Sequence, residues 1–263
     1  MRICSGRSSF SWLAIVTPTS LPRVDFDTHR LSFGAVASHY DRVRPTYPLA
    51  ALTWALGEAP KRIVDLGAGT GLLTRVAIQG GFDVVPVEPD PAMRAQLDAV
   101  TPGVTAMAGS AEAIPLPDSS VDGVIAGQAY HWFDGDKAHP EIARVLKPGG
   151  VFAPMWNERD TSMEWTAKLD EIMSPGQEES PERNFGSLFT EIEYAAFPHS
   201  TIQTPQGLCD LVASRSYYLV APPRQQAELL AQVMELCATH PSLSGREEFE
   251  LPYVTNVHRA FKR

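Results

Sequence analysis

The chain of 263 residues has few cysteines, no excess of positive charge and no long apolar run. Cys4, Cys209 and Cys237 are far apart and lack the spacing of metal ligands, so no metal site is expected. A formal net charge of −9 disfavours binding to a phosphate backbone, and neither nucleic acid nor a membrane is an expected partner. The N-terminal apolar stretch Phe10–Val16 is much shorter than the roughly twenty residues that cross a bilayer. These absences favour a reduced, cytoplasmic protein.

The most informative segment is IVDLGAGTG, Ile63–Gly71. Its apolar half, which ends at Asp65, predicts a buried parallel strand, because helices cover both faces of such a strand. The turn that follows has almost no side-chain bulk and consists of Gly67, Ala68, Gly69, Thr70 and Gly71. Such a turn lets the main chain approach a ligand closely. The next residues, LLTRVAIQ, predict a helix, so the ligand would meet a helix N-terminus.

A second predicted strand, Phe82–Glu88, ends in an acid. Glu88 follows Gly67 by 88 − 67 = 21 positions, which is typical of the carboxylate that binds ribose hydroxyls in a strand–helix–strand unit. A carboxylate can accept hydrogen bonds from two adjacent hydroxyls at once. The alternative is that Glu88 is a solvated charge at a strand end. Its register with the glycine turn favours the ribose role.

The turn with its preceding Asp65 resembles motif I of the class I S-adenosylmethionine-dependent methyltransferases, D-x-G-x-G-x-G, which lies against the methionine part of the cofactor. The dinucleotide fingerprint would instead place a glycine at Leu72. Four more segments resemble the type 11 subgroup, related to the ubiquinone-biosynthesis methylases. They are FGAVASHYDRVRPTYP (Phe33–Pro48), VEPDPAM with Glu88, GSAEAIPLPDSSVDGVIAG (Gly109–Gly127) and EIARVLKPGGVFAPMWN (Glu141–Asn157).

The resemblance implies an α/β fold with a doubly wound, Rossmann-like sheet of seven strands in the order 3-2-1-4-5-7-6, of which only strand seven is antiparallel. Residues 33–263 would form one domain, and residues 1–32 a flexible extension. Strands six and seven are expected near 188–200 and 247–262. Helical segments near 158–186 and 204–245, the latter with two helices, would cover the substrate.

The resemblance also implies S-adenosyl-L-methionine as cofactor. The residues expected to bind it are Asp65, Gly67, Ala68, Gly69, Gly71, Glu88, Ser110, Ala111, Glu112 and Gln128. Many relatives carry an aspartate at the position of Ser110, where its side chain meets the adenine amine. With serine there, adenine recognition would depend more on the backbone of Ala111 and Glu112.

Chemistry is expected beside the segment QAYHWF, Gln128–Phe133, directly after the fourth predicted strand. His131 has the residue type of a general base, since imidazole titrates near neutral pH. The alternative is that His131 lines the pocket and orients the loop. Tyr40 resembles the family's cap tyrosine, which lies over the cofactor and closes the site.

Several residues are candidates for contacts with the acceptor. Arg44 and Tyr47 either close the site and pair with an anionic substrate, or Arg44 is an ordinary surface arginine. The segment Asn157–Asp160 either reaches the same cavity, with Arg159 as a member, or anchors a turn. The segment Ser214–Tyr218 either lines the acceptor pocket or packs within a helix.

The sequence therefore predicts an enzyme that moves a methyl group from S-adenosylmethionine to a small-molecule acceptor, with a carboxylate or hydroxyl as candidate. One alternative is a catalytically silent module that binds the cofactor and serves as a regulatory or partner subunit. Another, disfavoured by Leu72 and by the LKPGG region, is an NAD-dependent oxidoreductase.

Overall fold

The computed structural model describes residues 41–59, 61–173 and 184–263. The predicted extension at 1–32 and the predicted cap residue Tyr40 lie outside these ranges. In chain order the elements are α3 (Leu49–Leu56), β1 (Arg62–Leu66), α4 (Leu72–Gln79), β2 (Asp83–Val87), α5 (Pro91–Val100), β3 (Val121–Gly127), the 3-10 turn η2 (Tyr130–Trp132), α6 (Gly135–Val145), β4 (Leu146–Arg159), α7 (Glu164–Met173), β5 (Glu193–Gln203), α8 (Pro205–Ala213), α9 (Ser216–Val220), α10 (Pro223–Thr239) and β6 (Phe249–Phe261).

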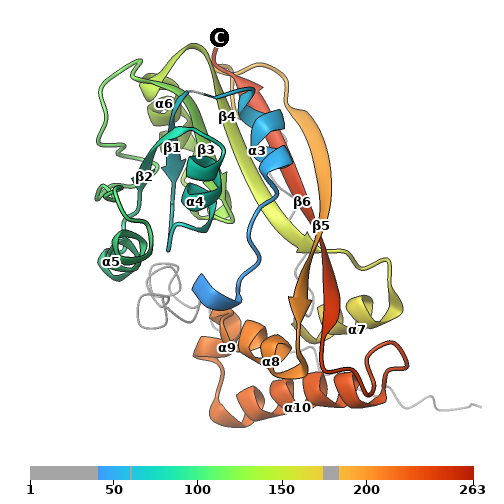
Figure 1. Cartoon of the computed structure of the whole chain (residues 1–263). Coiled ribbons are helices and arrows are strands. Elements are labelled where there is room, and N and C mark those ends of the chain that lie inside the picture. Colours follow the sequence, from blue (N-terminus) through green and yellow to red (C-terminus); the bar gives the residue numbers. More distant parts are fainter. Residues whose placement is uncertain (1–40, 60, 174–183) are drawn as a thin grey trace, which may run out of the picture.

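The strands form one sheet in the order β2-β1-β3-β4-β6-β5 (Figure 1). β1 pairs in parallel with β2 and β3, and β3 pairs in parallel with β4. β6 runs antiparallel to both of its neighbours, β4 and β5. The predicted α/β class, the strand order and the single antiparallel strand are thus confirmed.

The expected count of seven strands is wrong for the described chain, which has six. The expected third strand is reduced to one parallel bridge between Val87 and Met107. Between the turn at Gly103 and the next glycine, Gly109, the segment is only five residues long and ends in Ala-Met-Ala, and alanine is a poor strand former. A single bridge is what remains there.

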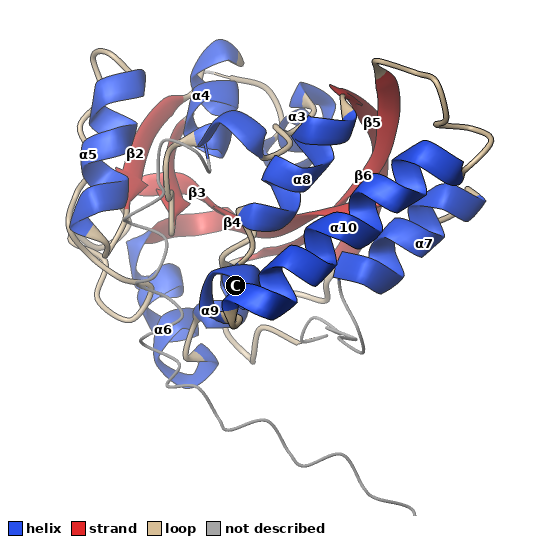
Figure 2. Ribbon diagram, turned by 90° about the horizontal axis from the view of Figure 1, so that it is seen from below, coloured by secondary structure: helices blue, strands red, loops and turns tan. Residues whose placement is uncertain are grey.

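Helices cover both faces of the parallel part of the sheet, as Figure 2 shows with α4 and α6 on opposite sides. One core cluster joins the apolar residues of α3 and α4 to the sheet, and a second joins α6 to the other face. β1 is accordingly buried on both sides, and Ile63, Val64 and Leu66 are fully inaccessible. This burial explains why its sequence shows no polar alternation.

A third core cluster lies outside the parallel sheet. It joins α7, α8 and α10 to β6 and includes Trp165, Leu208, Leu236 and Phe249. The helices α8, α9 and α10 lie together at one end of β5 and β6 (Figure 1). We call α7 to α10 the helical insert. The first of the two helices expected within 204–245 is divided, because α8 ends at Ala213 and α9 begins at Ser216, while α10 corresponds to the second.

Local signals fix several helix starts. The Asp90 side chain accepts hydrogen bonds from the backbone N–H groups of Ala92 and Met93, and Pro91 occupies the first turn of α5. Thr204 caps α8 in the same way. Within the described ranges, no helix is both long enough and apolar enough to cross a membrane.

Candidate functional site

The glycine turn between β1 and α4 is held against the end of β2. The N–H groups of Gly67 and Ala68 both donate to the carbonyl of Val87, at 2.8 and 3.1 Å. The three glycines of the turn, Gly67, Gly69 and Gly71, have φ values of 70°, 56° and 84°. A side chain would strain each of these left-handed conformations. The predicted turn therefore requires its glycines.

The surroundings of the three glycines differ. A Cβ at Gly67 would lie 2.7 Å from Ala129 Cβ, and one at Gly71 would lie 2.8 Å from a carbon of Leu97. A Cβ at Gly69 would meet no heavy atom of the described residues within 4 Å. Gly67 and Gly71 are thus packed against the protein, while Gly69 faces open space that a ligand can enter.

Glu88 lies directly beside this turn, as its spacing predicted. Its carboxylate accepts hydrogen bonds from the N–H of Gly69 at 2.9 Å and from the N–H of Asp90 at 2.8 Å. Glu88 is only 7% exposed, so it is not the solvated charge of the alternative interpretation. Burial raises its pKa, against the lowering effect of the two N–H donors. The two oxygens retain lone pairs for further donors.

Asp65 lies at the end of β1 and is 1% exposed. Thr74 of α4 donates its hydroxyl to Asp65 Oδ2 at 2.6 Å, while Oδ1 has no hydrogen-bond partner among the described residues. Burial, supported by the nearby charge of Glu88, raises the pKa of Asp65 to about 7. A buried carboxylate oxygen without a donor is suited to a cationic ligand. The sequence interpretation missed Thr74, although its position one turn into α4 places it over β1.

The loop that carries Ser110, Ala111 and Glu112 follows the Val87–Met107 bridge and borders the same edge of the sheet. Ala111 is buried, and Ser110 forms a small isolated bridge with Ala113. The Glu112 carboxylate accepts a hydrogen bond from the N–H of Asp134 at 3.0 Å. This bond ties the loop to the segment after β3, so the two predicted parts of the site are physically connected.

Gln128 directly follows β3 and has a φ of 52°, a left-handed value that is uncommon for a residue other than glycine. Its side-chain amide pairs with the backbone of Asn157, accepting from the N–H at 3.0 Å and donating to the carbonyl at 3.4 Å. The side chain of Gln128 is therefore used to hold β3 and β4 together. A contact with the cofactor would fall to its backbone.

The segment Tyr130–Phe133 turns its residues in different directions. Tyr130 is buried, and its hydroxyl lies 2.9 Å from His139 Nε2. Phe133 lies beside Gly67, 3.8 Å from the position of a Cβ there. His131 is exposed, with its ring centroid 4.8 Å from that of Trp132. The segment Tyr130–Phe133 thus contacts the glycine turn through Phe133, and the role of His131 as a general base stays a prediction.

Residues 41–48, which we call the cap segment, cross the carboxyl ends of the strands. Asp41 forms an ion pair with Arg75 of α4 at 2.6 Å, and Arg75 also donates to the carbonyl of Thr70. Tyr47 is 7% exposed and packs on the end of β3, where a Cβ at Gly127 would lie 2.7 Å from the tyrosine hydroxyl. The cap segment is therefore part of the site, as the sequence suggested for Tyr47.

Asn157 anchors this segment. Its side-chain nitrogen donates to the carbonyls of Pro45 and Thr46 at 3.3 and 3.0 Å, and its oxygen accepts from the Thr255 hydroxyl at 2.6 Å. Asp160 turns away and accepts from the N–H of Ser162. The sequence allowed the segment Asn157–Asp160 either to reach the cavity or to anchor a turn. The contacts of Asn157 are those of an anchor, since its side chain holds the cap segment.

Arg159 behaves differently from its neighbours. Its side chain is 6% exposed and forms an ion pair with Asp170 of α7. Arg44 donates to the carbonyl of Ser214 at 2.9 Å, so it is not an ordinary surface arginine. The cap segment, the end of β4 and the helical insert therefore converge.

The comparisons with known proteins agree with this geometry. Residues 64–153 match a family model described as a methyltransferase domain. An uncharacterised methyltransferase of Mycobacterium tuberculosis is 45% identical over 233 residues, which cover 88% of this chain and 95% of that protein. The chain belongs to the class I methyltransferases.

Two other proteins similar to this methyltransferase bear on its fold and its chemistry. A solved structure of a putative type II methyltransferase from Anaeromyxobacter dehalogenans has a TM-score of 0.65 and 26% identity, covering 84% of this chain and 97% of that one. A malonyl-[acyl-carrier protein] O-methyltransferase of Methylococcus capsulatus is 36% identical over 154 residues, which cover 51% of this chain and 56% of that protein.

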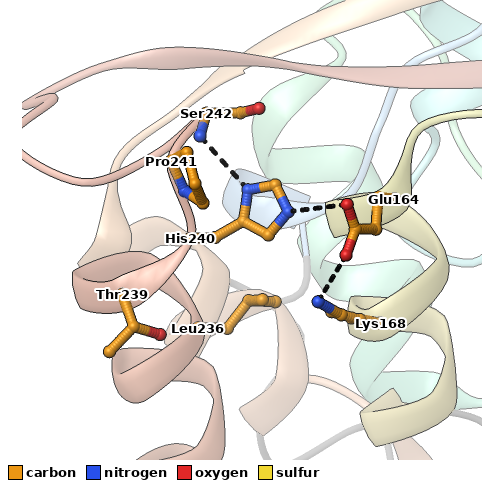
Figure 3. Close-up of a pocket in the computed structure, with 7 residues that line it drawn as sticks. All are labelled: Glu164, Lys168, Leu236, Thr239, His240, Pro241 and Ser242. Atoms are coloured by element: carbon orange, nitrogen blue, oxygen red, sulfur yellow. Dashed lines mark hydrogen bonds and ion pairs between the residues drawn. The ribbon is translucent and has the colours of Figure 1, made fainter.

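A pocket of about 400 Å³ in this methyltransferase lies elsewhere, between α7 and the end of α10 (Figure 3). Its polar groups are already engaged with one another. Glu164 pairs with Lys168 at 2.7 Å and lies 3.9 Å from His240, whose Nδ1 accepts from the N–H of Ser242. None of its lining residues belongs to the glycine turn or to the corner after β3, so it is separate from the candidate site.

Proposed function

We propose that this protein transfers a methyl group from S-adenosylmethionine to a small-molecule acceptor. The observation that carries the proposal is the open glycine turn at Gly69, flanked by the buried carboxylates of Asp65 and Glu88. The backbone of the turn can approach a nucleoside closely, and Glu88 has lone pairs for the two ribose hydroxyls. Asp65, with its unpaired Oδ1, would face the cationic methionine end.

When bound, S-adenosylmethionine would supply a methyl carbon activated by the sulfonium, to which the acceptor atom bonds in line while the C–S bond breaks and its electron pair stays on sulfur. The protein's own residues align the two substrates and exclude water. Tyr47 and Phe133 would form apolar walls of the site, since Phe133 lies close to Gly67 and Tyr47 lies close to Gly127 at the end of β3. Aromatic faces also attract a cation.

The acceptor atom decides whether a proton must move. A carboxylate acceptor loses no proton, and the name of the Methylococcus relative describes O-methylation of a malonyl group, which is consistent with such chemistry. A hydroxyl acceptor would release a proton to water or to His131. We favour the carboxylate, because that relative's name describes such chemistry and because transfer to a carboxylate needs no general base.

The first test is calorimetric titration of the full chain with S-adenosylhomocysteine and, in parallel, with NADH. We expect the first to bind and the second not to bind. Glu88→Gln should weaken S-adenosylhomocysteine at least tenfold, because hydrogen bonds to a charged group are worth about 1.5–3 kcal/mol. Glu191→Gln, a change of the same chemistry at an exposed position, should leave binding unchanged.

The second test measures transfer of a labelled methyl group to a panel of small organic acids and alcohols. Transfer to an acid supports the carboxylate assignment. Binding of S-adenosylhomocysteine without transfer to any acceptor would support the silent cofactor-binding module instead. The cytoplasmic location and the absence of nucleic-acid or membrane partners stay predictions.

A further inference from the structure

Three arginines from separate parts of the chain gather beneath the helical insert. Arg44 belongs to the cap segment, Arg159 ends β4, and Arg215 lies between α8 and α9. Arg44 donates to the carbonyl of Ser214, the neighbour of Arg215. Burial lowers the pKa of Arg215 to about 9, and the positive charges of Arg44 and Arg159 lower it further. The three guanidinium groups therefore interact electrostatically.

Two tyrosines complete the cluster. Tyr253 of β6 is paired in register with Arg159, is 1% exposed and stacks on His199 with ring centroids 5.6 Å apart. Tyr217 lies on α9. Burial raises the pKa of both tyrosines, although the three arginines act in the opposite direction. Both hydroxyls are thus neutral donors near pH 7.

Three polar atoms of this cluster are buried without a hydrogen-bond partner among the described residues: Arg215 Nε and the hydroxyls of Tyr217 and Tyr253. A buried donor without an acceptor is costly. Several such donors in one cluster indicate an acceptor that the described residues do not supply.

The charge of the cluster points the same way. Asp170 pairs with Arg159, and the positive charges of all three arginines act together on Tyr217 and Tyr253. The whole chain carries a net charge of −9, so a gathering of three arginines runs against the overall balance. Desolvation of a buried charge is costly, and Arg215 Nε is buried without a hydrogen-bond partner among the described residues.

The cluster adjoins the candidate methyl-transfer site. Asn157, which binds the cap segment and pairs with Gln128, precedes Arg159 by two residues, about 7 Å along an extended strand. The cap segment joins the two sites, since Tyr47 packs on Gly127 and Arg44 reaches the insert. A small molecule could span from one to the other.

We propose that Arg44, Arg159 and Arg215 bind a carboxylate or phosphate group of the acceptor, which is a small organic anion. This inference rests on the proposed methyl transfer, because only that reaction makes the bound anion an acceptor. The forked guanidinium groups and the two tyrosine hydroxyls donate to the oxyanion. An oxyanion with its lone pairs so occupied is a poor nucleophile, so the methyl group goes to a second nucleophilic group of the same molecule.

The first experiment uses the full chain and calorimetry with malonate, citrate and inorganic phosphate as probes, and malonamide as the uncharged control. Titrations are made at constant ionic strength, with and without S-adenosylhomocysteine. We expect at least one anion to bind and malonamide not to bind. A preference for malonate or citrate assigns a carboxylate substrate, and a preference for phosphate assigns a phosphorylated one.

Variants place that binding at the cluster. Arg215→Met should weaken the bound anion at least tenfold, and Tyr253→Phe should weaken it several-fold, because charge-assisted hydrogen bonds are the strong ones. Arg224→Met is the matched control, since Arg224 is a highly exposed arginine of α10 that pairs with Glu228. This control should bind the anion as the wild type does.

Thermal unfolding supplies a readout that a merely structural arginine would not give. Without anion, Arg215→Met should unfold at the same temperature as the wild type or higher, because it removes a buried charge that repels Arg44 and Arg159. Added anion should stabilise the wild type and not this variant. A structural role predicts a lower unfolding temperature in all conditions.

The outcomes separate the two proposals. If S-adenosylhomocysteine binds but no anion binds, or if Arg215→Met binds the anion unchanged, the anion site is overturned and the methyltransferase proposal stands. If the anion binds through Arg215 but S-adenosylhomocysteine does not bind, the anion site is supported and the proposed function is overturned.

Discussion

Asn157 and Thr46 are 111 residues apart in the sequence, yet the Asn157 side chain donates a hydrogen bond to the Thr46 carbonyl at 3.0 Å. The same amide accepts from Thr255 on β6. One buried side chain, which lies on β4, therefore connects the cap segment to β4 and to the neighbouring strand β6. The position of the cap over the candidate site depends on this contact.

Replacement of Asn157 should release the cap segment. Asn157→Ala leaves the buried Thr255 hydroxyl and the Thr46 carbonyl without this partner, and we expect a loss of about 2–3 kcal/mol in the free energy of unfolding. Asn157→Asp should be worse, because a carboxylate would face two backbone carbonyls. Urea unfolding measures both effects.

Asn184→Ala serves as the control, since Asn184 is exposed and, among the described residues, accepts a hydrogen bond from the N–H of its near neighbour Gly186. We expect it to change the free energy of unfolding by less than about 0.5 kcal/mol. Equal stability of Asn157→Ala and the wild type would show that the cap segment does not depend on this amide.

Local patterns were sufficient to predict the cofactor half of the fold. Buried strands such as Ile63–Leu66 have a continuous apolar sequence, and positive φ values demand glycine at Gly67, Gly69 and Gly71. The distance from Gly67 to Glu88 follows from the length of one strand–helix–strand unit. Each of these signals lies within about 25 residues of sequence.

The acceptor half carries no comparable signal. Arg44, Arg159, Arg215 and Tyr253 come from four segments, and their meeting is decided by how the helical insert packs on β6. Arginine and tyrosine at such positions are equally typical of a surface or a helix interior. The bridge that replaces the expected third strand was also missed, because one residue pair depends on tertiary packing more than on propensity.

His131 should prove dispensable for proton transfer if the acceptor is a carboxylate. His131→Gln should keep the shape of the kcat against pH profile and change kcat by less than about tenfold, since a general base contributes about 10²–10⁴-fold. The profile is measured with whichever acid of the panel accepts methyl groups. The loss of an ionisation from the profile, together with a fall of about a hundredfold or more, would identify His131 as the base.

Asp65 should make cofactor binding depend on pH. The folded protein holds the pKa of Asp65 at about 7, above the ordinary value of 3.8, so the protonated form is favoured without ligand. The ammonium group at the amino-acid end of S-adenosylhomocysteine needs the ionised form. The affinity for S-adenosylhomocysteine should therefore rise by up to tenfold per pH unit toward about pH 7 and then level off. Calorimetry between pH 5 and pH 8 measures this dependence.

Two variants test the assignment to Asp65. Asp65→Asn should bind weakly and flatten the pH dependence, leaving only the contribution of Glu88, whose pKa is also raised. Thr74→Val removes a hydroxyl that lowers the pKa of Asp65, so the levelling point should move to higher pH. Because the pKa of Asp65 is raised in the folded protein, this carboxyl lowers the stability of the ligand-free protein as pH rises from about 4 to about 7. Asp65→Asn should remove this contribution and leave that of Glu88.

Gly69 and Gly103 form a natural pair for testing the ligand site. Both have a positive φ, 56° and 87°, and within the part of the chain that the structure describes a Cβ at either would meet no heavy atom within 4 Å. Alanine at each position should therefore cost a similar amount of stability, about 1–2 kcal/mol, through backbone strain alone.

Of these two glycines, only Gly69 lies beside the Glu88 carboxylate. Gly69→Ala should weaken S-adenosylhomocysteine about tenfold, because its methyl group would occupy ligand space and overpacking costs about 1–3 kcal/mol. Gly103→Ala should bind as the wild type does. Thermal unfolding and calorimetry on the two variants separate strain from obstruction, and an equal effect of both on binding would place the ligand away from the glycine turn.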